Sequence, residues 1–389
     1  MKKYDVLIVM DYYLPGRLSG GPVTTIEGFT EKLGSNLRFL VITHNYDIDN
    51  NKYKNLVEKE YYTVGNADVI YVNDPDFNPR FIDRLVNKHH INYIYFNSFF
   101  SRKTIFCLMR NKFRKFDSHI VLAPRGEFSE GALSIHYWKK HVYLKLFLIF
   151  NLQRNITFQA SNAIEKDAIT KEFRDAYIKI ASDIPVMQDG IEGRISFGLP
   201  KVVFISRIVP MKNLDFALNI LAKMTESILF HIYGPVEDKN YWEKCKNLIN
   251  SMPKNITVEY QGILDHSDVS ETFKEYDVFL IPSLGENFGH VIFESLAAGC
   301  PVIVSDKTPW LDLENAGVGW VVPLKHPEGF ASAIREVVSA TEKQKTERSV
   351  RCIEYAYRAS RNEEVIADNY RLFGHDHLGK AKINDGEVE

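Results

Sequence analysis

The sequence predicts an α/β fold made of two doubly wound domains. Short apolar runs alternate with amphipathic or polar segments along most of the chain, and this alternation is typical of buried parallel strands connected by helices. The pattern begins at Val6 and begins again at Lys201, after the segment 185–200, which is rich in glycine and proline. A segment of that composition is a suitable hinge. We therefore expect an N-terminal domain at 1–195 and a C-terminal domain at 196–360.

The elements of the first domain follow from the positions of its apolar runs. Buried strands are predicted at 6–10, 39–43, 69–72, 93–96 and 119–123. A helix is predicted at 22–33, after a loop that contains Gly20 and Gly21. Polar or helical segments separate most of these strands, as expected for a doubly wound sheet.

The second domain repeats this order of elements. Strands are predicted at 202–205, 228–233, 256–260, 278–281 and 301–304. The apolar spacing of 214–224 predicts a helix after the first of them. Residues 361–373 follow the completed second sheet, and we expect them to form a helix that returns to the N-terminal domain. The polar tail 374–389 is expected to fray.

Composition and charge exclude several classes of protein. The chain has 389 residues, of which 45% are hydrophobic, enough for two domains with separate cores. Its formal net charge of −2 argues against a nucleic-acid-binding protein. The four cysteines form no Cys-x-x-Cys pair, which indicates a reducing compartment and neither zinc nor disulfides. Since there is no apolar signal core and no apolar run of about 20 residues, we predict a cytoplasmic protein.

The most informative segment is 282–305, in which a strand ends, a short loop follows and a helix begins. Glu286 lies just before the start of this helix, and Glu294 lies inside it. Carboxylates accept strong hydrogen bonds from hydroxyl groups. The N–H groups at a helix N-terminus bind anions or hydroxyls, and here they belong to Phe288, Gly289 and His290. The alternative interpretation is a capped helix with two solvated glutamates.

A second motif follows the strand at 202–205. Arg207 and Lys212 stand in the loop after that strand, and the carboxyl ends of parallel strands are where ligands bind in open α/β sheets. Arginine offers a planar fork to phosphate oxygens and lysine offers a mobile positive charge. The pair is therefore suited to a diphosphate. The alternative is an ordinary surface pair on a loop.

The segment 282–305 closely resembles the Glu-x7-Glu motif of the retaining glycosyltransferases of family 4, which have the GT-B fold. The resemblance covers most of the chain, most strongly at 200–305, less at 120–195 and least at 1–100. It implies two Rossmann-like domains that face each other across a cleft, with a nucleotide-sugar donor held by the second domain.

The resemblance also implies a role for each matching residue. Glu294 corresponds to the glutamate that binds the ribose, and Glu286 to the glutamate that holds hydroxyls of the transferred sugar. Arg207 and Lys212 correspond to the residues that bind the diphosphate and stabilise it as the leaving group. Contacts of the backbone with sugar and phosphate are implied for Asn287, Phe288 and Gly289.

The sites implied in the first domain are less sharply marked. The loop with Gly20 and Gly21 would close over the donor phosphates, and its alternative is a plain turn. Arg125 is expected on the acceptor side together with Asn97, although Arg125 could equally be a buried structural arginine. Relatives often have a histidine near the position of Asn97. Since the stretch 95–98 contains neither His nor Asp, Glu127 is our candidate for a catalytic base.

A metal ion is not expected. Asp47 and Asp49, and likewise Asp74 and Asp76, match the short Asp-x-Asp pattern that holds manganese in another glycosyltransferase fold. Neither pair lies near the nucleotide motifs in the sequence, so we interpret both as loops. Arg207 and Lys212 can supply the positive charge that a metal would supply. No cofactor is expected either.

The predicted reaction is transfer of a sugar from a nucleotide-sugar, with UDP as the expected nucleotide, to a saccharide or lipid-linked saccharide, with retention of configuration. A role in the synthesis of a bacterial surface polysaccharide, such as O-antigen or capsule, is expected. Two alternatives stay open. One is a nucleotide-sugar epimerase of the same fold, and the other is a non-catalytic protein that binds nucleotide-sugars.

The charge distribution suggests a further partner. Residues 102–145 contain ten lysines and arginines against three acidic residues, whereas 200–340 contain twelve against eighteen. Within the basic region, 136–150 mixes aromatic, aliphatic and lysine residues in the manner of an interfacial helix. We therefore expect attachment to an anionic membrane surface, peripheral on the inner face. The alternative is a core helix that covers the first sheet.

Overall fold

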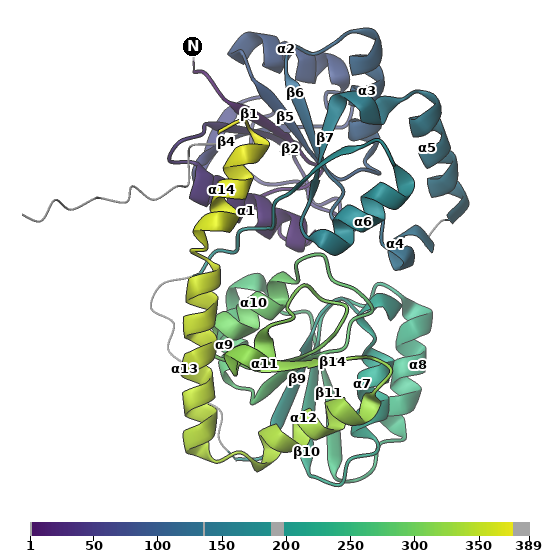
Figure 1. The fold of residues 1–389 in the computed structure, drawn as a ribbon, viewed down its shortest axis with the longest axis vertical. Helices are drawn as coiled ribbons and strands as arrows, with labels where there is room; N and C mark the ends of the chain where they lie inside the picture. Colours follow the sequence, from purple (N-terminus) through teal and green to yellow (C-terminus); the bar gives the residue numbers. More distant parts are fainter. Residues whose placement is uncertain (1, 135–136, 188–197, 376–389) are drawn as a thin grey trace, which may run out of the picture. The chain divides into compact units, whose positions relative to one another are not determined.

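The computed structural model describes residues 2–134, 137–187 and 198–375 (Figure 1). The chain forms two compact units. Unit 1 consists of Met1–Val186 and Arg361–Glu389, and unit 2 consists of Met187–Ser360. The predicted hinge at 185–200 falls largely on 188–197, and the predicted tail falls largely on 376–389; both of these ranges lie outside the described residues.

Unit 1 is built on an eight-stranded sheet with the strand order β3-β4-β2-β1-β5-β6-β7-β8. All neighbouring strands are parallel except β3 and β4, which are antiparallel. The strands are β1 (Val6–Val9), β2 (Phe39–His44), β3 (Tyr61–Val64), β4 (Ala67–Val72), β5 (Tyr93–Asn97), β6 (His119–Ala123), β7 (Ile156–Ala160) and β8 (Tyr177–Ile180). The central strands are almost entirely buried, because helices cover both faces of the sheet (Figure 1).

The helices of unit 1 pack in two separate apolar cores. The helices of unit 1 are α1 (Gly21–Leu33), α2 (Pro79–His89), α3 (Arg102–Phe113), α4 (Glu130–Ser134), α5 (Tyr137–Ile149), α6 (Ala163–Glu172) and α14 (Glu363–Leu372). Side chains of α2, α3, α5 and α6 share one core, and those of α1 and α14 share the other. The alternation along each strand, with successive residues in opposite cores, explains why the strands read as continuous apolar runs.

The last helix, α14, packs on unit 1, as the sequence predicted. The Nδ2 atom of Asn369 donates a hydrogen bond to the carbonyl oxygen of Ser182 at 2.8 Å. The ring centroid of Phe373, just after the helix, lies 5.5 Å from those of both Phe29 and Tyr93. These contacts bury a helix that follows all of unit 2 in the sequence.

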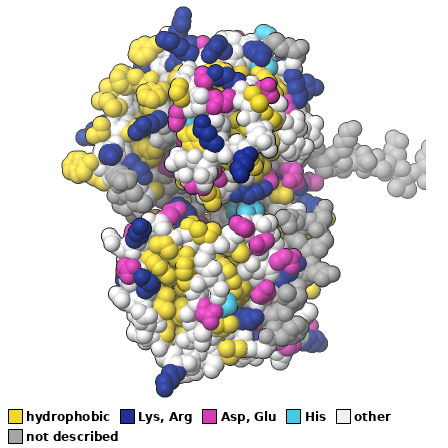
Figure 2. Space-filling view, turned by 180° about the vertical axis from the view of Figure 1, so that it is seen from behind, with side chains coloured by type: hydrophobic (Ala, Val, Ile, Leu, Met, Phe, Trp, Pro, Cys, Tyr) yellow, Lys and Arg dark blue, Asp and Glu magenta, His cyan; other side chains and the backbone are white. Residues whose placement is uncertain are grey.

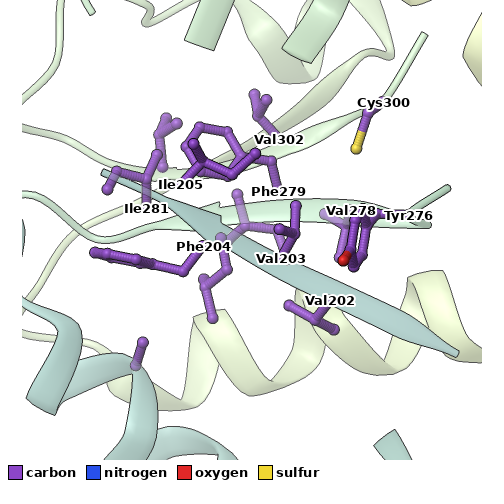
Figure 3. Close-up of a cluster of buried hydrophobic side chains, with 14 of the residues drawn as sticks. Val202, Val203, Phe204, Ile205, Tyr276, Val278, Phe279, Ile281, Cys300 and Val302 are labelled. Carbon is purple, nitrogen blue, oxygen red and sulfur yellow. The ribbon is translucent and has the colours of Figure 1, made fainter. Parts of the chain in front are cut away.

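Unit 2 contains a six-stranded, all-parallel sheet with the order β11-β10-β9-β12-β13-β14. Its strands are β9 (Lys201–Ile205), β10 (Ile228–Tyr233), β11 (Ile256–Gly262), β12 (Val278–Ile281), β13 (Val302–Ser305) and β14 (Gly319–Val322). Its helices are α7 (Leu214–Leu221), α8 (Lys239–Asn250), α9 (Val269–Lys274), α10 (His290–Ala297), α11 (Leu313–Ala316), α12 (Pro327–Ser339) and α13 (Glu342–Ala359). Figure 3 shows the centre of its core, where Phe204 of β9 and Phe279 of β12 lie among branched aliphatic side chains.

The order of the strands in unit 2 determines where its loops meet. Strands β9 and β12 are neighbours, with Val202 beside Val278 and Val203 beside Phe279, and both point the same way. The loops that follow them therefore leave the sheet at the same edge, at the point where the order of connection reverses. The two motifs predicted from the sequence lie on these two loops.

Candidate functional site

The two loops of unit 2 are joined by an ion pair between residues of the two motifs. Lys212 Nζ lies 2.6 Å from Glu286 Oε1 and 2.8 Å from Glu286 Oε2. The two side chains are only 13% and 8% exposed. Lys212 ends a short 3-10 turn (Pro210–Lys212) after β9, and Glu286 stands between β12 and α10. The structure thus brings together a cation and an anion that the sequence assigned to one donor site.

Further hydrogen bonds hold the loop of Glu286 in place. Ser283 Oγ donates to Glu286 Oε1 at 2.6 Å, and the backbone N–H of Glu286 donates to the carbonyl oxygen of Lys307 at 3.1 Å. The N–H of Leu284 donates to the carbonyl oxygen of Met211 at 2.9 Å, which ties the loop to that of Lys212. The loop of Glu286 is therefore tied to the segments that follow β9 and β13, the two strands next to β12.

The backbone at the start of α10 has the conformation that a glycine permits. Gly289 is the N-cap of the helix and has a φ of 83°, a value that other residues rarely adopt. A Cβ at this position would lie 2.9 Å from the Cδ1 of Ile292. On the other side, Trp310 Nε1 donates to the carbonyl oxygen of Phe288 at 2.6 Å. The loop before the helix is therefore packed against Ile292 and hydrogen-bonded to Trp310.

Glu294 and Arg207 lie at the periphery of this arrangement. Glu294 is in the second turn of α10, its side chain is 23% exposed, and its Oε1 lies 3.5 Å from His266 Nε2. The Arg207 guanidinium is 58% exposed and its Nη1 donates to Glu237 Oε2 at 3.1 Å. Both side chains can accordingly reorient toward a ligand, whereas Lys212 and Glu286 are held.

The glycine loop of unit 1 also precedes a helix. Gly20 is the N-cap of α1 with a φ of 67°, and no atom lies within 4 Å of the position a Cβ would occupy there. The backbone, and not the available space, is therefore what favours glycine at this residue. Gly21 is the first residue of α1. The loop thus leads directly into the N-terminus of α1.

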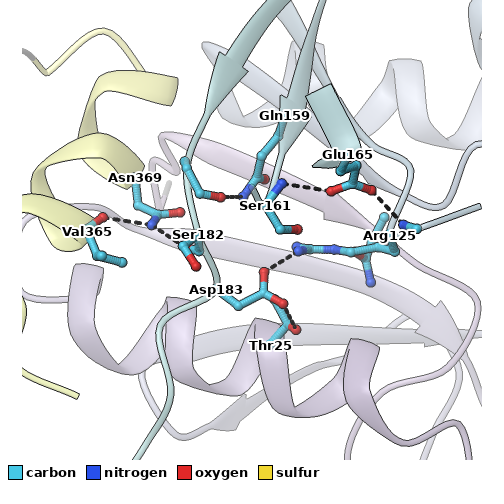
Figure 4. A network of polar contacts seen from close by, with 12 residues as sticks. Thr25, Arg125, Gln159, Ser161, Glu165, Ser182, Asp183, Val365 and Asn369 are labelled. Atoms are coloured by element: carbon cyan, nitrogen blue, oxygen red, sulfur yellow. Dashed lines mark hydrogen bonds and ion pairs between the residues drawn. The ribbon is translucent and has the colours of Figure 1, made fainter. Parts of the chain in front are cut away.

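Arg125 and Asn97 are brought together, but inside unit 1. Arg125 Nε donates to Asn97 Oδ1 at 2.7 Å, and its Nη1 pairs with Asp183. Figure 4 shows that Asp183 also accepts a hydrogen bond from Thr25. The side chains of Arg125 and Asp183 are only 8% and 3% exposed. Of the two interpretations of Arg125 that the sequence left open, this geometry favours the buried structural arginine, which ties β6 to the end of β8 and to α1.

Glu127 is engaged by three donors. It accepts hydrogen bonds from Ser98 Oγ at 2.7 Å, from the N–H of Phe99 at 2.6 Å and from the N–H of Phe100 at 3.1 Å. Burial raises the pKa of this carboxyl group above its ordinary value, and the three hydrogen bonds oppose that shift. These bonds hold the loop between β5 and α3. They use three of the roughly four lone-pair sites of the carboxylate, which leaves one for a proton.

The two Asp-x-Asp pairs lie in loops, as interpreted from the sequence. Asp47 accepts hydrogen bonds from the N–H groups of Leu18 and Ile48, and Asp74 accepts one from the hydroxyl of Tyr46. Within the part of the chain that the structure describes, no group of three or more His, Cys, Asp or Glu residues is arranged to hold a metal ion.

Several residues that shape the site were not predicted from the sequence. Ser283 and Trp310 position the loop around Glu286, and Lys307 supplies the carbonyl that anchors it. Ser283 lies inside the motif and has a hydroxyl beside a carboxylate, so its role could have been inferred. Lys307 and Trp310 follow a different strand, and no local pattern marks them.

Solved structures with the same architecture identify the fold. The two-domain α/β architecture with parallel sheets is the GT-B fold of glycosyltransferases. A sucrose-phosphate synthase from Thermosynechococcus elongatus superposes with a TM-score of 0.70 at 13% identity, covering 96% of this chain and 99% of that one. The Anabaena protein HepE, in a structure with UDP and glucose, superposes with a TM-score of 0.66 at 16% identity, covering 95% and 98%.

Sequence comparison finds similarity over part of the chain. Residues 193–359 match the family of glycosyl transferases group 1. The chain is 30% identical over 209 residues to the sulfoquinovosyl transferase SQD2 of Arabidopsis thaliana, over 49% of this chain and 37% of that protein. It is 28% identical over 180 residues to the GtfA subunit of a UDP-N-acetylglucosamine–peptide N-acetylglucosaminyltransferase of Streptococcus agalactiae, over 43% and 34%. The chain thus spans less than half the length of these relatives.

Proposed function

We propose that this protein is a retaining glycosyltransferase that moves a sugar from a nucleotide-sugar to a saccharide or lipid-linked saccharide. The observation that carries the proposal is the contact of Lys212 with Glu286 beside the N-terminus of α10. It joins a phosphate-binding cation to a hydroxyl-binding anion at the carboxyl edge of a parallel sheet, where such sheets bind ligands. The match of 193–359 to glycosyl transferases group 1 covers this site.

The donor would be held by both motifs at once. The ammonium group of Lys212 has three N–H donors, and the two carboxylate oxygens of Glu286 occupy two of them. The third can reach a phosphate oxygen while Glu286 accepts hydrogen bonds from the sugar. Glu294 would accept hydrogen bonds from the ribose, and Asn287 to Gly289 would offer backbone N–H groups to the diphosphate.

The same groups would lower the barrier to transfer. Breaking the anomeric bond develops oxocarbenium character on the sugar and negative charge on the leaving phosphate. Lys212, Arg207 and the N–H groups before α10 oppose that negative charge. With Glu286 orienting the sugar, the acceptor oxygen would attack on the face from which the diphosphate leaves, which retains configuration. We assign the acceptor proton to the departing phosphate oxygen, because the carboxylate of Glu127 holds the loop between β5 and α3 through its hydrogen bonds to Ser98, Phe99 and Phe100.

UDP is the nucleotide we propose. The HepE structures contain UDP, or UDP-glucose, bound to a chain of the same fold, and the GtfA relative carries UDP-N-acetylglucosamine in its name. A thermal-shift screen of UDP-, GDP- and ADP-sugars tests this choice. A rise in melting temperature with UDP-sugars, absent from the Glu294→Ala variant, supports it, whereas a rise only with GDP- or ADP-sugars would replace UDP.

A lipid-linked acceptor would bring the protein to a membrane surface, and α5 has the surface for it. The helix buries Leu144 and Phe147 in the core of unit 1, as the alternative interpretation expected. Its outer face exposes large apolar side chains, of which Trp138 is 80% and Ile149 is 70% exposed. Val142 and Leu146 continue that face.

Basic residues accompany this apolar face. Lys139 and Lys145 of α5 are exposed, and Phe113, at the end of the basic helix α3, is 73% exposed. Figure 2 shows hydrophobic side chains among Lys and Arg side chains on the surface of unit 1. This mixture of apolar and basic side chains is the composition of an interfacial helix. We propose that α5 rests on an anionic membrane face. No helix among the described residues is long and apolar enough to span a bilayer.

The epimerase alternative predicts a different product. An epimerase would need acid and base groups beside the sugar ring, and the groups that the motifs of unit 2 provide around Glu286 are suited to binding. Incubation with the donor alone distinguishes the two. Formation of a second nucleotide-sugar would support the epimerase, and release of the nucleoside diphosphate supports the transferase. A non-catalytic binding protein would produce neither.

A further inference from the structure

Unit 1 contains a pocket that the two motifs do not use. It is a cavity of about 470 Å³, within the roughly 300–1,000 Å³ of small-molecule sites. Its walls come from the residues that follow β1, the end of β2, the loop after β4 and the first turns of α2 and α3. It therefore lies at the carboxyl edge of the parallel sheet of unit 1, where ligands bind in such sheets.

The polar wall of the pocket is organised around Asp74. Tyr46 OH donates to Asp74 Oδ2 at 2.7 Å, and Lys103 Nζ donates to Asp74 Oδ1 at 3.2 Å. The side chain of Asp74 is nevertheless 64% exposed, so its oxygens have room for further donors. Asp11 lies on the same wall, with a side chain that is 36% exposed. Two carboxylates therefore face the cavity.

Aromatic rings form the rest of this wall. His44 is stacked on Tyr46 at a centroid distance of 4.6 Å, and the ring of Tyr12 lies 6.0 Å from His44 and lines the cavity. His44 Nε2 lies 3.7 Å from Asp74 Oδ1 and 3.9 Å from Asp11 Oδ1. Burial and the nearby Lys103 lower the pKa of His44, which favours the uncharged ring.

The charges of the pocket indicate the class of ligand. The lining contains Asp11 and Asp74 against Arg102 and Lys103, and Lys103 is already paired with Asp74. A phosphate or another anion would meet two carboxylates without an excess of positive charge. An uncharged ligand with many hydroxyls fits better, because carboxylates accept hydrogen bonds from hydroxyls and tyrosine rings offer flat apolar surfaces to a sugar ring.

We propose that this pocket binds an uncharged saccharide unit, whose hydroxyls donate to Asp11 and Asp74 and whose ring lies against Tyr12. The inference rests on the proposed glycosyl transfer, of which this saccharide would be part of the acceptor. The Asp74 loop would then bind a saccharide and not a metal ion. Asp11, Asp74 and Tyr12 would be the residues that select the acceptor.

Saturation-transfer NMR on the full chain tests this inference. The probes are glucose, galactose, N-acetylglucosamine and the disaccharide maltose, each at millimolar concentration without donor, with glucuronate as the charged counterpart. The variants are Asp74→Asn and Tyr12→Leu. Asp117→Asn is the matched control, because Asp117 is exposed and precedes the opposite, amino-terminal end of β6. Melting curves establish that each variant is folded.

We expect at least one neutral sugar to bind, and Asp74→Asn to weaken it by about tenfold or more, the usual effect of losing a hydrogen bond to a charged group. Tyr12→Leu should weaken it as well, and Asp117→Asn should not. Binding of glucuronate alone would overturn the inference, as would binding of no neutral sugar, or equal binding to wild type and Asp74→Asn. Titration of the same samples with UDP, GDP and ADP separates the two proposals: binding of a nucleotide without sugar binding rejects the pocket alone, and binding of none of the three rejects the proposed function.

Discussion

The ammonium group of Lys212 contacts both carboxylate oxygens of Glu286, at 2.6 and 2.8 Å, across 74 residues of sequence. Both side chains are largely buried. Removing one partner of a buried pair costs about 3–5 kcal/mol, because the other charge is left without compensation. A single substitution here therefore changes stability as well as chemistry, and a double substitution is needed to separate them.

For Lys212→Met we expect the free energy of unfolding to fall by about 3–5 kcal/mol, and kcat to fall by about 100-fold or more, because a charge that stabilises the leaving group is lost. Lys212→Met/Glu286→Gln should recover most of the stability and none of the activity. Denaturant titration and steady-state kinetics measure the two effects. Recovery of kcat in the double variant, or a rise in donor KM with unchanged kcat, would contradict leaving-group stabilisation.

Glu294→Ala should weaken binding of the nucleoside diphosphate by about 1.5–3 kcal/mol, the contribution of a hydrogen bond to a charged acceptor. The side chain is partly exposed and contacts only His266 among the ion pairs described for it, so the fold should tolerate the change. Isothermal titration with UDP measures the loss. Glu354→Ala, at an exposed position of α13, is the control. Equal affinities in the two variants would remove Glu294 from the ribose site.

Glu127→Gln distinguishes a structural carboxylate from a base. Burial raises the folded-state pKa of Glu127, so its contribution to stability is greatest at low pH and is lost as the pH rises through that pKa. Glutamine does not titrate. The stability of the wild type should therefore decline relative to Glu127→Gln with rising pH, as measured by denaturant titration at each pH.

The same variant has a kinetic readout. The donors of Ser98, Phe99 and Phe100 lose one acceptor oxygen, so we expect a lower melting temperature with kcat within a few-fold of wild type. A loss of kcat on the order of 100-fold in a protein that stays folded would instead restore Glu127 as the base.

Flotation with anionic vesicles tests the membrane contact of α5. Lys139→Glu/Lys145→Glu should reduce binding at low salt by more than tenfold, since each charge near an anionic surface contributes about 1 kcal/mol. Lys140 is left unchanged because its Nζ donates to the carbonyl of Ala132 at 2.7 Å. Lys223→Glu/Lys254→Glu, at exposed positions of unit 2, is the matched control. A wild type that does not float at low salt would leave α5 as a plain cover of the sheet.

Sequence patterns predicted most of the strands of both sheets. The expected apolar runs correspond to β1, β2, β4, β5 and β6 in unit 1 and to β9, β10, β11, β12 and β13 in unit 2. Strands β3, β7, β8 and β14 were not predicted. The residues of β3 and β8 are partly exposed, Thr157 and Gln159 interrupt the apolar residues of β7, and β14 has only three residues after Gly319, so none of them forms a long continuous apolar run. These strands are therefore determined more by the strands they pair with than by their own composition.

The site was predicted in part, for a related reason. The motif spacing indicated Lys212, Glu286 and Glu294, but the contact between the first two depends on β9 and β12 being neighbours, and the sequence does not state the order of strands. The same applies to Arg125, whose partner Asp183 lies 58 residues away. Whether a polar group is buried depends on such distant partners. The sequence alone therefore did not distinguish a surface role of Arg125 from a role in the core.

Release of UDP from UDP-sugars by the purified full chain tests the central claim most directly. The measurement follows UDP by mass spectrometry with EDTA present, for the wild type and for Glu286→Gln. We predict slow release from at least one UDP-sugar without acceptor, faster release when a saccharide acceptor is added, and a reduction of about 100-fold or more in Glu286→Gln. No release from any donor by the wild type, or equal release by the two proteins, would contradict the account.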